Sequence, residues 1–377
     1  MKNSAKLKIV RAATLGTSLN TFCEGLLKEL TDEGYEVVAL SSPDGDLDEL
    51  SKREGVRTIG VHMERRISPW NDLVSLVKIV RALKREKPDM VHSMTPKAGL
   101  LCMMASRWVG VPIRVHTFTG LVWPTATGLS RRILMMTDKL TCACATHIIP
   151  EGEGVKMDLQ RSITQKPMKV LGYGNVKGID LDYWKRTTKK DGQPFTFVFV
   201  GRIVRDKGMN ELIPAFVRLH KECTDTRLLL VGSFEDDIDP VSPETKHLIE
   251  SSDGIEAVGE QKDVRPFYEQ SDVLVFPSYR EGFPNVVIEA GAMDLPSIVT
   301  DINGSREIIE NGENGVIVPP RNEQALYNAM KWMIEHPEDR ISMAENARPM
   351  VASRYEQGFV RQCLKDYYKE ILDGEII

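Results

Sequence analysis

The chain has 377 residues, of which 42% are hydrophobic and 27% charged, a composition typical of a soluble globular protein with two domains of ordinary size. Residues 1–8 lack the apolar core of a signal peptide, and no run approaches the ~20 apolar residues that cross a bilayer, so we expect a cytoplasmic protein. The six Cys fit neither a disulfide framework nor a zinc site, which predicts reduced thiols.

Charge is distributed unevenly along the chain. Residues 1–180 carry 26 Lys and Arg against 19 Asp and Glu, whereas residues 181–377 carry 23 against 35. Either the first half meets an anionic surface or acceptor, or both halves simply expose solvated charge.

The N-terminal segment alternates between strands and helices. A strand is predicted at 7–13, a helix at 19–33 and a second strand at 35–40. Because the alternation continues, the predicted fold class is α/β with doubly wound parallel sheets. Gly16, in the first strand–helix turn, either lets a phosphate or sugar approach the backbone or serves only the turn.

An acidic turn and a basic helix follow. The turn at 44–48 lacks the Gly and Glu that a calcium loop needs at its sixth and twelfth positions, so we predict a polar turn ahead of a helix. The helix at 71–85 is expected to turn its apolar residues inward, namely Leu73, Leu76, Val77, Val80 and Leu83. Its basic residues form either a solvated face or a patch for acidic lipid headgroups or a pyrophosphate-linked acceptor.

Two strands of the first half end in polar residues. The strand at 89–94 is followed by Thr95 and Lys97, and the strand at 114–118 is followed by Thr119. Open α/β sheets bind ligands at the carboxyl ends of their strands, so these three residues are acceptor-side candidates. His92 and His116, inside the strands, are expected to be structural.

Apolar and basic residues are mixed at 121–136. Core packing of the Leu and Met side chains in this segment is the preferred interpretation. The alternative is that the segment rests on a membrane surface.

The second half restarts the alternation after a polar linker at 181–194. A strand at 195–200 leads through a loop at 201–208 into a helix at 209–221. In that loop Arg202 offers a planar fork to phosphate oxygens and Lys207 adds a compact positive charge. Arg205 and Asp206 are expected on the surface.

An acidic loop at 235–239 contains Asp-x-Asp, a metal–nucleotide signature of a different fold. Because the context here is wrong for that signature, we interpret the segment as a solvated loop and predict no metal site. Beyond it, a strand is predicted at 255–259.

Residues 272–293 carry the strongest indication of function. An apolar strand at 272–277 is followed by a turn with Gly282 and a helix at 286–293. The N-terminus of such a helix presents free N–H groups and a positive dipole end, which bind anions. Glu281 and Glu289 flank this end and suit hydroxyl groups, so the pattern predicts a ligand that carries both phosphate and sugar. The remaining predicted elements are strands at 296–301 and 315–320 and helices at 322–334, 337–352 and 359–371.

Two motifs carry a family resemblance. Glu281-x7-Glu289 resembles the E-x7-E signature of the family 4 retaining glycosyltransferases, and the loop at 201–208 resembles their G-R-x4-K-G phosphate loop. The similarity covers nearly the whole chain. The segment at 92–99 is similar to members that build bacterial surface polysaccharides, such as capsule, O-antigen or exopolysaccharide. Thr119 stands where many members have His.

This resemblance implies the GT-B fold, in which two doubly wound Rossmann-like domains face each other across a cleft. The domain at 1–182 would bind the acceptor, and the domain at 183–358 would bind the nucleotide-sugar donor. A last helix at 359–377 would cross back to the first domain.

The reaction implied by the resemblance moves a sugar from a nucleotide-diphosphate donor, UDP before GDP, to a saccharide acceptor. A saccharide linked to polyprenyl diphosphate is the acceptor that best fits the basic first half of the chain. Arg202, Lys207 and the helix N-terminus would stabilise the leaving phosphate, so neither a metal nor a cofactor is required. Glu281 would position the donor sugar or, alternatively, act as a nucleophile. The catalytic candidates are Glu281, Arg202 and Lys207. The donor-binding candidates are Gly16, Gly201, Arg202, Lys207, Gln261, Lys262, Glu281, Gly282, Phe283, Pro284, Asn285, Val286 and Glu289.

Two other functions stay open. One is a nucleotide-sugar epimerase of the same fold, and the other is a non-catalytic scaffold that binds nucleotide sugars. No nucleic-acid partner is expected. The basic first half favours peripheral contact with the anionic inner face of the cytoplasmic membrane.

Overall fold

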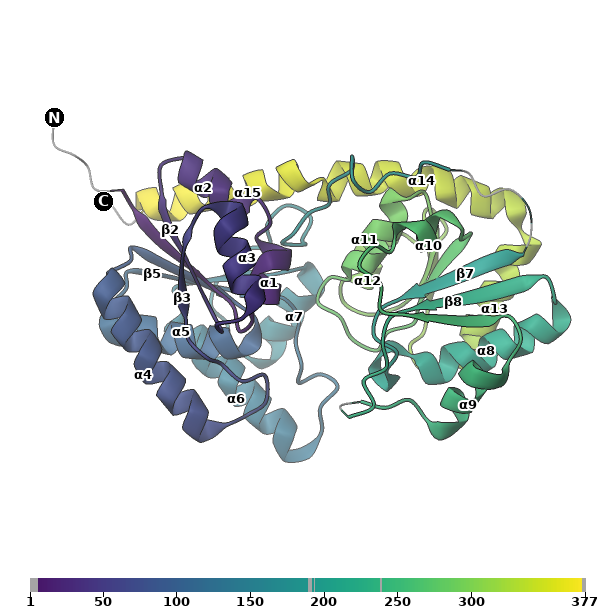
Figure 1. Cartoon of the computed structure of the whole chain (residues 1–377), viewed down its shortest axis with the longest axis horizontal. Coiled ribbons are helices and arrows are strands. Elements are labelled where there is room, and N and C mark those ends of the chain that lie inside the picture. Colours follow the sequence, from purple (N-terminus) through teal and green to yellow (C-terminus); the bar gives the residue numbers. More distant parts are fainter. Residues whose placement is uncertain (1–5, 189–191, 193, 238, 375–377) are drawn as a thin grey trace. The chain divides into compact units, whose positions relative to one another are not determined.

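The computed structural model describes residues 6–188, 192, 194–237 and 239–374. The chain divides into two compact units, Met1–Gly178 with Gly358–Ile377, and Ile179–Gln357. Each unit contains one six-stranded sheet with helices on both faces, which confirms the predicted α/β class (Figure 1). Parts of the predicted linker, 189–191 and 193, and residue 238 of the acidic loop lie outside the described residues.

The first unit has the strand order β3-β2-β1-β4-β5-β6, and every strand pair is parallel. The order reverses between β1 and β4, which makes the carboxyl edge at these strands a topological switch point, where open α/β sheets bind ligands. The elements are β1 (Lys8–Ala12), α1 (Gly16–Phe22), α2 (Leu26–Asp32), β2 (Glu36–Ser41), α3 (Gly45–Glu54), β3 (Arg57–Gly60), α4 (Pro69–Glu86), β4 (Met90–Met94), α5 (Pro96–Val109), β5 (Ile113–Phe118), α6 (Gly128–Cys144), β6 (His147–Pro150), α7 (Glu153–Ser162) and α15 (Gln357–Gly374).

Side chains of this sheet alternate between two apolar layers. Along β1, Ile9 packs into the layer formed with α1, α2, α3 and α15, whereas Val10 packs into the layer formed with α4, α5, α6 and α7. This alternation is the period-2 geometry of a strand that is buried on both faces. The C-terminal helix α15 therefore belongs to the core of the first unit (Figure 1).

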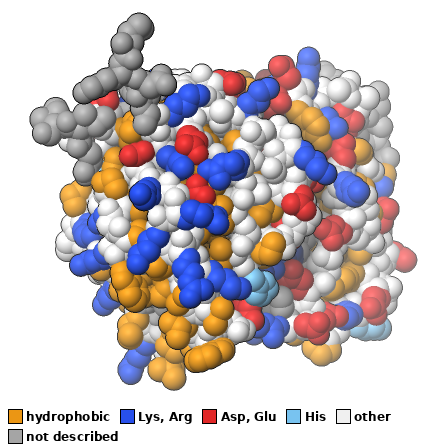
Figure 2. Space-filling view, turned by 60° about the vertical axis from the view of Figure 1, so that its left-hand side comes forward, with side chains coloured by type: hydrophobic (Ala, Val, Ile, Leu, Met, Phe, Trp, Pro, Cys, Tyr) orange, Lys and Arg blue, Asp and Glu red, His pale blue; other side chains and the backbone are white. Residues whose placement is uncertain are grey.

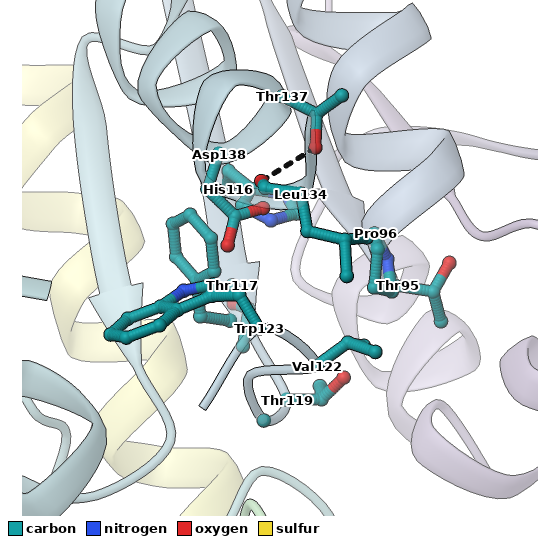
Figure 3. A pocket seen from close by; sticks show the side chains of 12 residues that line it. Thr95, Pro96, His116, Thr117, Thr119, Val122, Trp123, Leu134, Thr137 and Asp138 are labelled. Atoms are coloured by element: carbon teal, nitrogen blue, oxygen red, sulfur yellow. Dashed lines mark hydrogen bonds between the residues drawn. The ribbon is translucent and has the colours of Figure 1, made fainter. Parts of the chain in front are cut away.

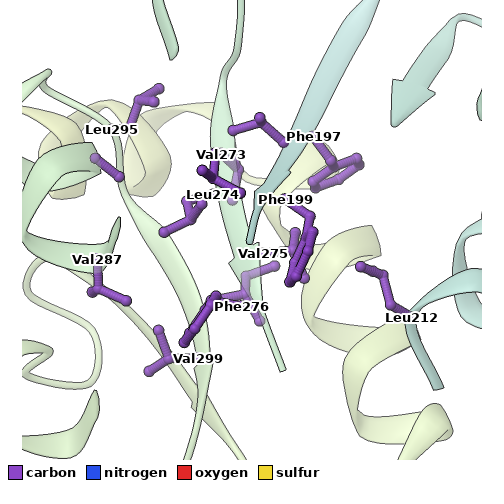
Figure 4. Close-up of a cluster of buried hydrophobic side chains, with 14 of the residues drawn as sticks. Phe197, Phe199, Leu212, Val273, Leu274, Val275, Phe276, Val287, Leu295 and Val299 are labelled. Atoms are coloured by element: carbon purple, nitrogen blue, oxygen red, sulfur yellow. The ribbon is translucent and has the colours of Figure 1, made fainter. Parts of the chain in front are cut away.

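The second unit repeats the same topology with the order β12-β11-β10-β7-β8-β9, and its switch point lies between β7 and β10. Phenylalanines of β7 and the apolar run of β10 fill the centre of its core (Figure 4). The elements are β7 (Phe195–Val200), the 3₁₀ turn η1 (Arg205–Lys207), α8 (Met209–Glu222), β8 (Thr226–Val231), α9 (Pro243–Ser251), β9 (Ile255–Gly259), α10 (Arg265–Glu269), β10 (Val273–Phe276), α11 (Asn285–Ala292), β11 (Ser297–Thr300), α12 (Ser305–Ile308), β12 (Gly315–Val318), α13 (Glu323–Glu335) and α14 (Pro337–Tyr355).

The predicted helix at 19–33 is in fact two helices, so this prediction is wrong. The first helix ends at Phe22, and Gly25, the N-cap residue of the second, has a left-handed φ of 69°. The buried carboxylate of Glu54 accepts hydrogen bonds from the N–H groups of Gly25 (2.8 Å) and Lys28 (3.2 Å). A side chain from α3 thus caps the N-terminus of α2, and this cap replaces the helical hydrogen bonds that a continuous helix would have made.

Two predictions about apolar faces are only partly correct. On α4, Leu76 and Leu83 are buried as predicted, but Leu73 and Val77 are exposed to 51% and 41% because the buried stripe runs through Leu76, Ile79 and Leu83. In the segment at 121–136, Leu121 is buried and Leu134 and Met135 pack against the core, whereas Leu129 and Met136 of α6 are exposed to 72% and 69%. Figure 2 is turned so that the side with α4 comes forward. On this side, hydrophobic side chains lie next to Lys and Arg side chains.

The predicted linker is anchored where the structure describes it. Leu181 and Trp184 pack against the core of the second unit, and Arg186 donates hydrogen bonds to the carbonyl oxygens of Glu269 (2.8 Å) and Ser271 (3.0 Å). The described part of this segment therefore packs as part of the second unit. All six Cys are unpaired, as predicted. Within the described ranges, no helix has the length and hydropathy needed to cross a membrane.

Candidate active site

Two loops meet at the switch point of the second sheet. The loop at 201–208 follows β7, and the turn at 277–284 follows β10, its neighbour in the sheet. Because the strands are parallel, both loops leave the sheet at its carboxyl edge, and the two sequence motifs are brought together there.

Glycines allow the close contact between these loops. Gly208 has a φ of 76°, and a Cβ atom at this position would lie 2.1 Å from the carbonyl oxygen of Pro277. Gly232, at the end of β8, has a φ of 151°, and a Cβ atom there would lie 1.9 Å from the carbonyl oxygen of Gly201. Any larger side chain at either position would push the loops apart.

Lys207 and Glu281 form an ion pair at the centre of the site. The same oxygen of Glu281 also accepts a hydrogen bond from the Ser278 hydroxyl at 2.6 Å. The Lys207 ammonium lies 5.0 Å from the centre of the Phe276 ring, which adds a cation–π contact. Both side chains of the pair are less than one fifth exposed, so the predicted cation and the predicted carboxylate hold one another in a fixed position.

Asp206 joins the two loops, which corrects the prediction that it is merely a surface residue. Its carbonyl oxygen accepts the N–H of Tyr279 at 2.8 Å, and its carboxylate accepts the guanidinium of Arg280 at 3.1 Å. Asp239 in turn accepts the N–H of Asp206 at 2.7 Å and pairs with Arg205 at 2.9 Å. The acidic loop predicted to be solvated therefore folds against the phosphate-loop motif.

Arg202 pairs with Glu235 of the same acidic loop at 2.6 Å. The Arg202 side chain is 44% exposed, so the pair contributes little to stability and can exchange its carboxylate for another anion. No cluster of His, Cys, Asp and Glu that could hold a metal ion is present within the described part of the chain.

The N-terminus of α11 lies directly after the turn. Pro284 occupies the cap position and has no polar side chain to satisfy the first N–H groups of the helix, which starts at Asn285. Gly304 packs so closely that a Cβ atom would lie 2.4 Å from the carbonyl oxygen of Gly282. The Phe283 side chain points into the core and packs edge-on against Tyr355, so only its backbone lies at the site.

Glu289, inside α11, lies beside the buried Tyr268. Burial, followed by the charge of Glu289 and a hydrogen bond to it, raises the pKa of the Tyr268 phenol well above its usual value. Tyr268 thus stays protonated beside the carboxylate of Glu289, and its hydroxyl donates to the carbonyl oxygen of Val286 at 3.3 Å.

Three other donor-side candidates have different surroundings. Gln261 and Lys262 are exposed after β9, and the Gln261 amide donates to the carbonyl oxygen of Val258 at 2.9 Å. Gly16 belongs to the first unit, where its N–H donates to Asp44 at 3.1 Å. A Cβ atom at Gly16 would lie 2.1 Å from the Asp44 carboxylate, so close packing against the α3 N-cap explains this glycine.

At the switch point of the first sheet, Thr95 has a backbone φ of 68°, which is rare for a β-branched residue and costs about 1–3 kcal/mol. Its hydroxyl oxygen accepts the N–H of Thr14 at 3.0 Å and also bonds the Thr14 hydroxyl at 2.8 Å. Strain of this kind clusters at functional sites. Thr95 and Thr119 line the same small cavity (Figure 3).

The Lys97 ammonium contacts groups of the first unit. Its ammonium contacts both carboxylate oxygens of Asp72 at 2.5 and 2.6 Å and donates to the carbonyl oxygen of Arg66 at 2.8 Å. The β4–α5 turn is thereby tied to the N-terminal end of α4.

The two histidines of the first sheet are buried. His92 bonds Thr117 at 2.7 Å and lies against Tyr368 of α15. Burial lowers the pKa of His116 to about 3, so its imidazole is neutral at physiological pH. Both residues have the structural surroundings that the sequence predicted.

Comparison with known proteins identifies the family. Residues 18–174 match the model described as glycosyl transferase 4-like domain, and residues 194–336 match the model described as glycosyl transferases group 1. The chain is also 31% identical over 390 aligned positions to the capsular polysaccharide biosynthesis glycosyltransferase CapM of Staphylococcus aureus, covering 99% of this chain and 98% of CapM. The chain belongs to the family 4 glycosyltransferases.

One further relative and one solved structure are also similar to this glycosyltransferase. An Escherichia coli protein named UDP-Gal:alpha-D-GlcNAc-diphosphoundecaprenol alpha-1,3-galactosyltransferase is 25% identical, and the alignment covers 82% of each chain. The crystal structure of Anabaena HepE in complex with UDP superimposes with a TM-score of 0.78 over 97% of this chain, at 16% identity. The glycosyltransferase therefore has the GT-B fold that the motifs implied.

The site of this glycosyltransferase contains groups that its motifs do not specify. Glu235 pairs with Arg202, Asp239 supports Asp206 and pairs with Arg205, and Tyr268 lies beside Glu289. Only the Asp-x-Asp spacing of the acidic loop drew attention to any of them, and it suggested a metal rather than an arginine partner.

Proposed function

We propose that this glycosyltransferase moves a sugar from a nucleotide-diphosphate donor, with UDP as the favoured nucleotide, to a saccharide linked to a lipid diphosphate. The reaction would retain the anomeric configuration, proceed without a metal, and serve the assembly of a surface polysaccharide. The names of CapM and of the Escherichia coli galactosyltransferase support the acceptor class and the biosynthetic role. The UDP complex of HepE supports the choice of nucleotide.

The observation that carries the proposal is the pairing of two loops at one switch point. Arg202, Lys207 and the N-terminal end of α11 supply positive charge there, whereas Glu281 and Glu289 supply acceptors. A diphosphate suits the first set and the hydroxyls of ribose and sugar suit the second. The same ligand class would satisfy both, and it is the class that a sugar-nucleotide provides.

In the proposed reaction the bond between the sugar C1 and the β-phosphate oxygen breaks as the acceptor oxygen bonds C1 from the same face. The acceptor hydroxyl gives its proton to the leaving phosphate. Arg202 and Lys207 stabilise the charge that develops on this phosphate, and Glu281 holds the donor sugar in the reactive pose. Because the protein supplies this positive field, no metal ion is needed.

An exposed amphipathic surface supports a lipid-linked acceptor. Trp70, Leu73 and Val77 on α4 and Leu129 and Met136 on α6 are all at least 41% exposed. Both helices begin at the carboxyl edge of the sheet, because α4 follows β3 and α6 follows β5. Apolar residues beside Lys and Arg suit a membrane with anionic lipids, at whose cytoplasmic face we place the enzyme (Figure 2).

Nucleotide binding tests the donor assignment. UDP at about 100 times its dissociation constant is expected to stabilise the protein by about 2.7 kcal/mol, with GDP, ADP and TDP giving smaller shifts. The measurement is a thermal melt with each nucleotide, in the presence and absence of EDTA. A UDP shift that needs added metal would contradict the metal-independent site, and no shift with any nucleotide would contradict the donor site itself. Retention is checked separately from the anomeric coupling constant of the product.

Liposome binding tests the membrane surface. Replacing Trp70 and Leu73 together by Ser is expected to weaken binding to vesicles with anionic lipids at least about 10-fold, because each large apolar side chain contributes about 1.5–3 kcal/mol when buried. Trp108→Ser is the matched control, since Trp108 is 73% exposed but lies at the far end of α5, away from the carboxyl edge. Equal losses of vesicle binding in both variants would argue against this surface. So would binding to neutral vesicles that does not change with salt concentration.

A further inference from the structure

A cavity of about 20 Å³ lies in the first unit, at the carboxyl ends of β4 and β5. Such a volume holds one group the size of a water molecule. Its walls include Thr95, Thr119, Trp123 and Asp138 (Figure 3). The cavity therefore belongs to the edge where the sequence predicts the acceptor.

A hydrogen-bond donor and an acceptor line this cavity. Trp123 is 4% exposed, and its indole nitrogen has no hydrogen-bond partner among the residues that the structure describes. Asp138 lies on α6, and burial raises the pKa of its carboxyl to about 7, an effect that the nearby Trp123 N–H partly offsets. A buried donor and a partly buried acceptor thus line the same small space.

Several other polar groups around the cavity already have hydrogen-bond partners. The Thr137 hydroxyl donates to the carbonyl oxygen of Leu134 at 2.8 Å, and the Thr95 hydroxyl bonds Thr14. His116 on β5 bonds Ser93 at 2.9 Å and is neutral. The remaining titratable or charged neighbours are Cys142 on α6, whose pKa burial raises to about 12, and Arg131, which lies over the Trp123 ring.

We propose that this cavity is an acceptor subsite that takes a single saccharide hydroxyl, which donates to the Asp138 carboxylate and accepts from the Trp123 N–H. A hydroxyl has one donor and two acceptor lone pairs, so it satisfies both groups at once. The proposal rests on the proposed function, because it assumes that the saccharide acceptor lies at this edge. It adds a determinant of acceptor specificity that the two sequence motifs do not contain.

Such a subsite discriminates by leaving groups unpaired. An acceptor that lacks the relevant hydroxyl buries the carboxylate and the indole N–H without a partner, and unpaired buried groups cost more than a lost contact alone. The site therefore rejects the matching deoxy sugar more strongly than an apolar pocket would.

The test uses the full-length enzyme, UDP-sugars, and GlcNAc-diphosphoundecaprenol with a set of analogues in which one sugar hydroxyl at a time is replaced by hydrogen. Asp138→Asn and Trp123→Phe are expected to raise the acceptor KM about 10-fold, while the donor KM and the rate of donor hydrolysis stay unchanged. Thr137→Val is the matched control, because it removes a hydroxyl that lines the same cavity but is already paired, and it should behave as the wild type.

A double-mutant cycle between protein and acceptor identifies the hydroxyl. For one deoxy analogue, the acceptor KM of the wild type should rise about 10-fold. Asp138→Asn should not raise the KM for this analogue further, since both changes remove the same interaction. In addition, the wild-type acceptor KM should fall as the pH rises from about 6 to about 8, because the ionised carboxyl is the stronger acceptor. Asp138→Asn should abolish this pH dependence. A merely structural carboxyl would change the melting temperature but neither of these readouts.

Three results would overturn the subsite. They are an unchanged acceptor KM in both variants, additive losses for every deoxy analogue, and a wild type that consumes the donor only by hydrolysis; in the first two cases the cavity holds water alone. None of these results affects the donor assignment, which the UDP melt tests in the other unit. Absence of any UDP shift would instead contradict the donor assignment.

Discussion

Arg202→Ala is expected to lower kcat/KM for the nucleotide-sugar about 1,000-fold and to abolish stabilisation by UDP. The guanidinium is the planar cation of the β7 loop, and its only carboxylate partner that we find, Glu235, is part of a half-exposed pair that a diphosphate can replace. Removing one preorganised donor from a site of developing negative charge costs about 100- to 1,000-fold in rate, and lost ground-state binding adds to this.

Arg205→Ala is the matched control for that measurement. Arg205 lies three residues further along the same loop, its side chain is 62% exposed, and its carboxylate partner is Asp239. We expect kcat/KM to stay within about 3-fold of the wild type, because exposed ion pairs contribute little. Equal losses in both variants would indicate that the loop had simply rearranged, and an unchanged Arg202→Ala enzyme would show that the Glu235 pair is structural.

Glu281→Gln separates positioning of the donor from nucleophilic attack. If Glu281 only holds the sugar, Gln keeps the shape and part of the hydrogen bonding, and kcat should fall about 10- to 100-fold. If Glu281 forms a covalent intermediate, turnover should fall by about 100,000-fold or more, because the amide cannot attack C1. We expect the smaller loss, since the carboxylate is engaged by Lys207 and by the Ser278 hydroxyl on one oxygen.

Glu289→Gln gives the comparison for Glu281. We expect it to raise the donor KM with little change in kcat, because a ribose contact lies away from the reacting carbon. Steady-state kinetics of the two variants side by side, with an added small nucleophile such as azide, make the distinction. Restored turnover of Glu281→Gln with azide, giving a glycosyl azide, would favour the nucleophile and contradict positioning.

The sequence alone determined the fold class and the core of the candidate site. The apolar strands, the glycine turns and the helix spacing are local features, so the strand–loop–helix units around Arg202, Lys207, Glu281 and Glu289 were predictable. Parallel strands then place successive loops at one edge, which is why two motifs some 75 residues apart meet in an ion pair.

The tertiary structure alone decided which distant side chains meet. Glu54, on another element, caps α2 and so interrupts the helix predicted at 19–33. Asp239 belongs to a loop that was predicted to be solvated, but it accepts a hydrogen bond from the N–H of Asp206. Helical periodicity marks Leu73 and Leu129 as apolar, but it does not show whether a neighbouring element covers them. Asp138 and Trp123 face one cavity only because α6 folds over the end of β5. Burial and partner choice are sums over contacts between remote segments, and a local pattern of residues does not contain them.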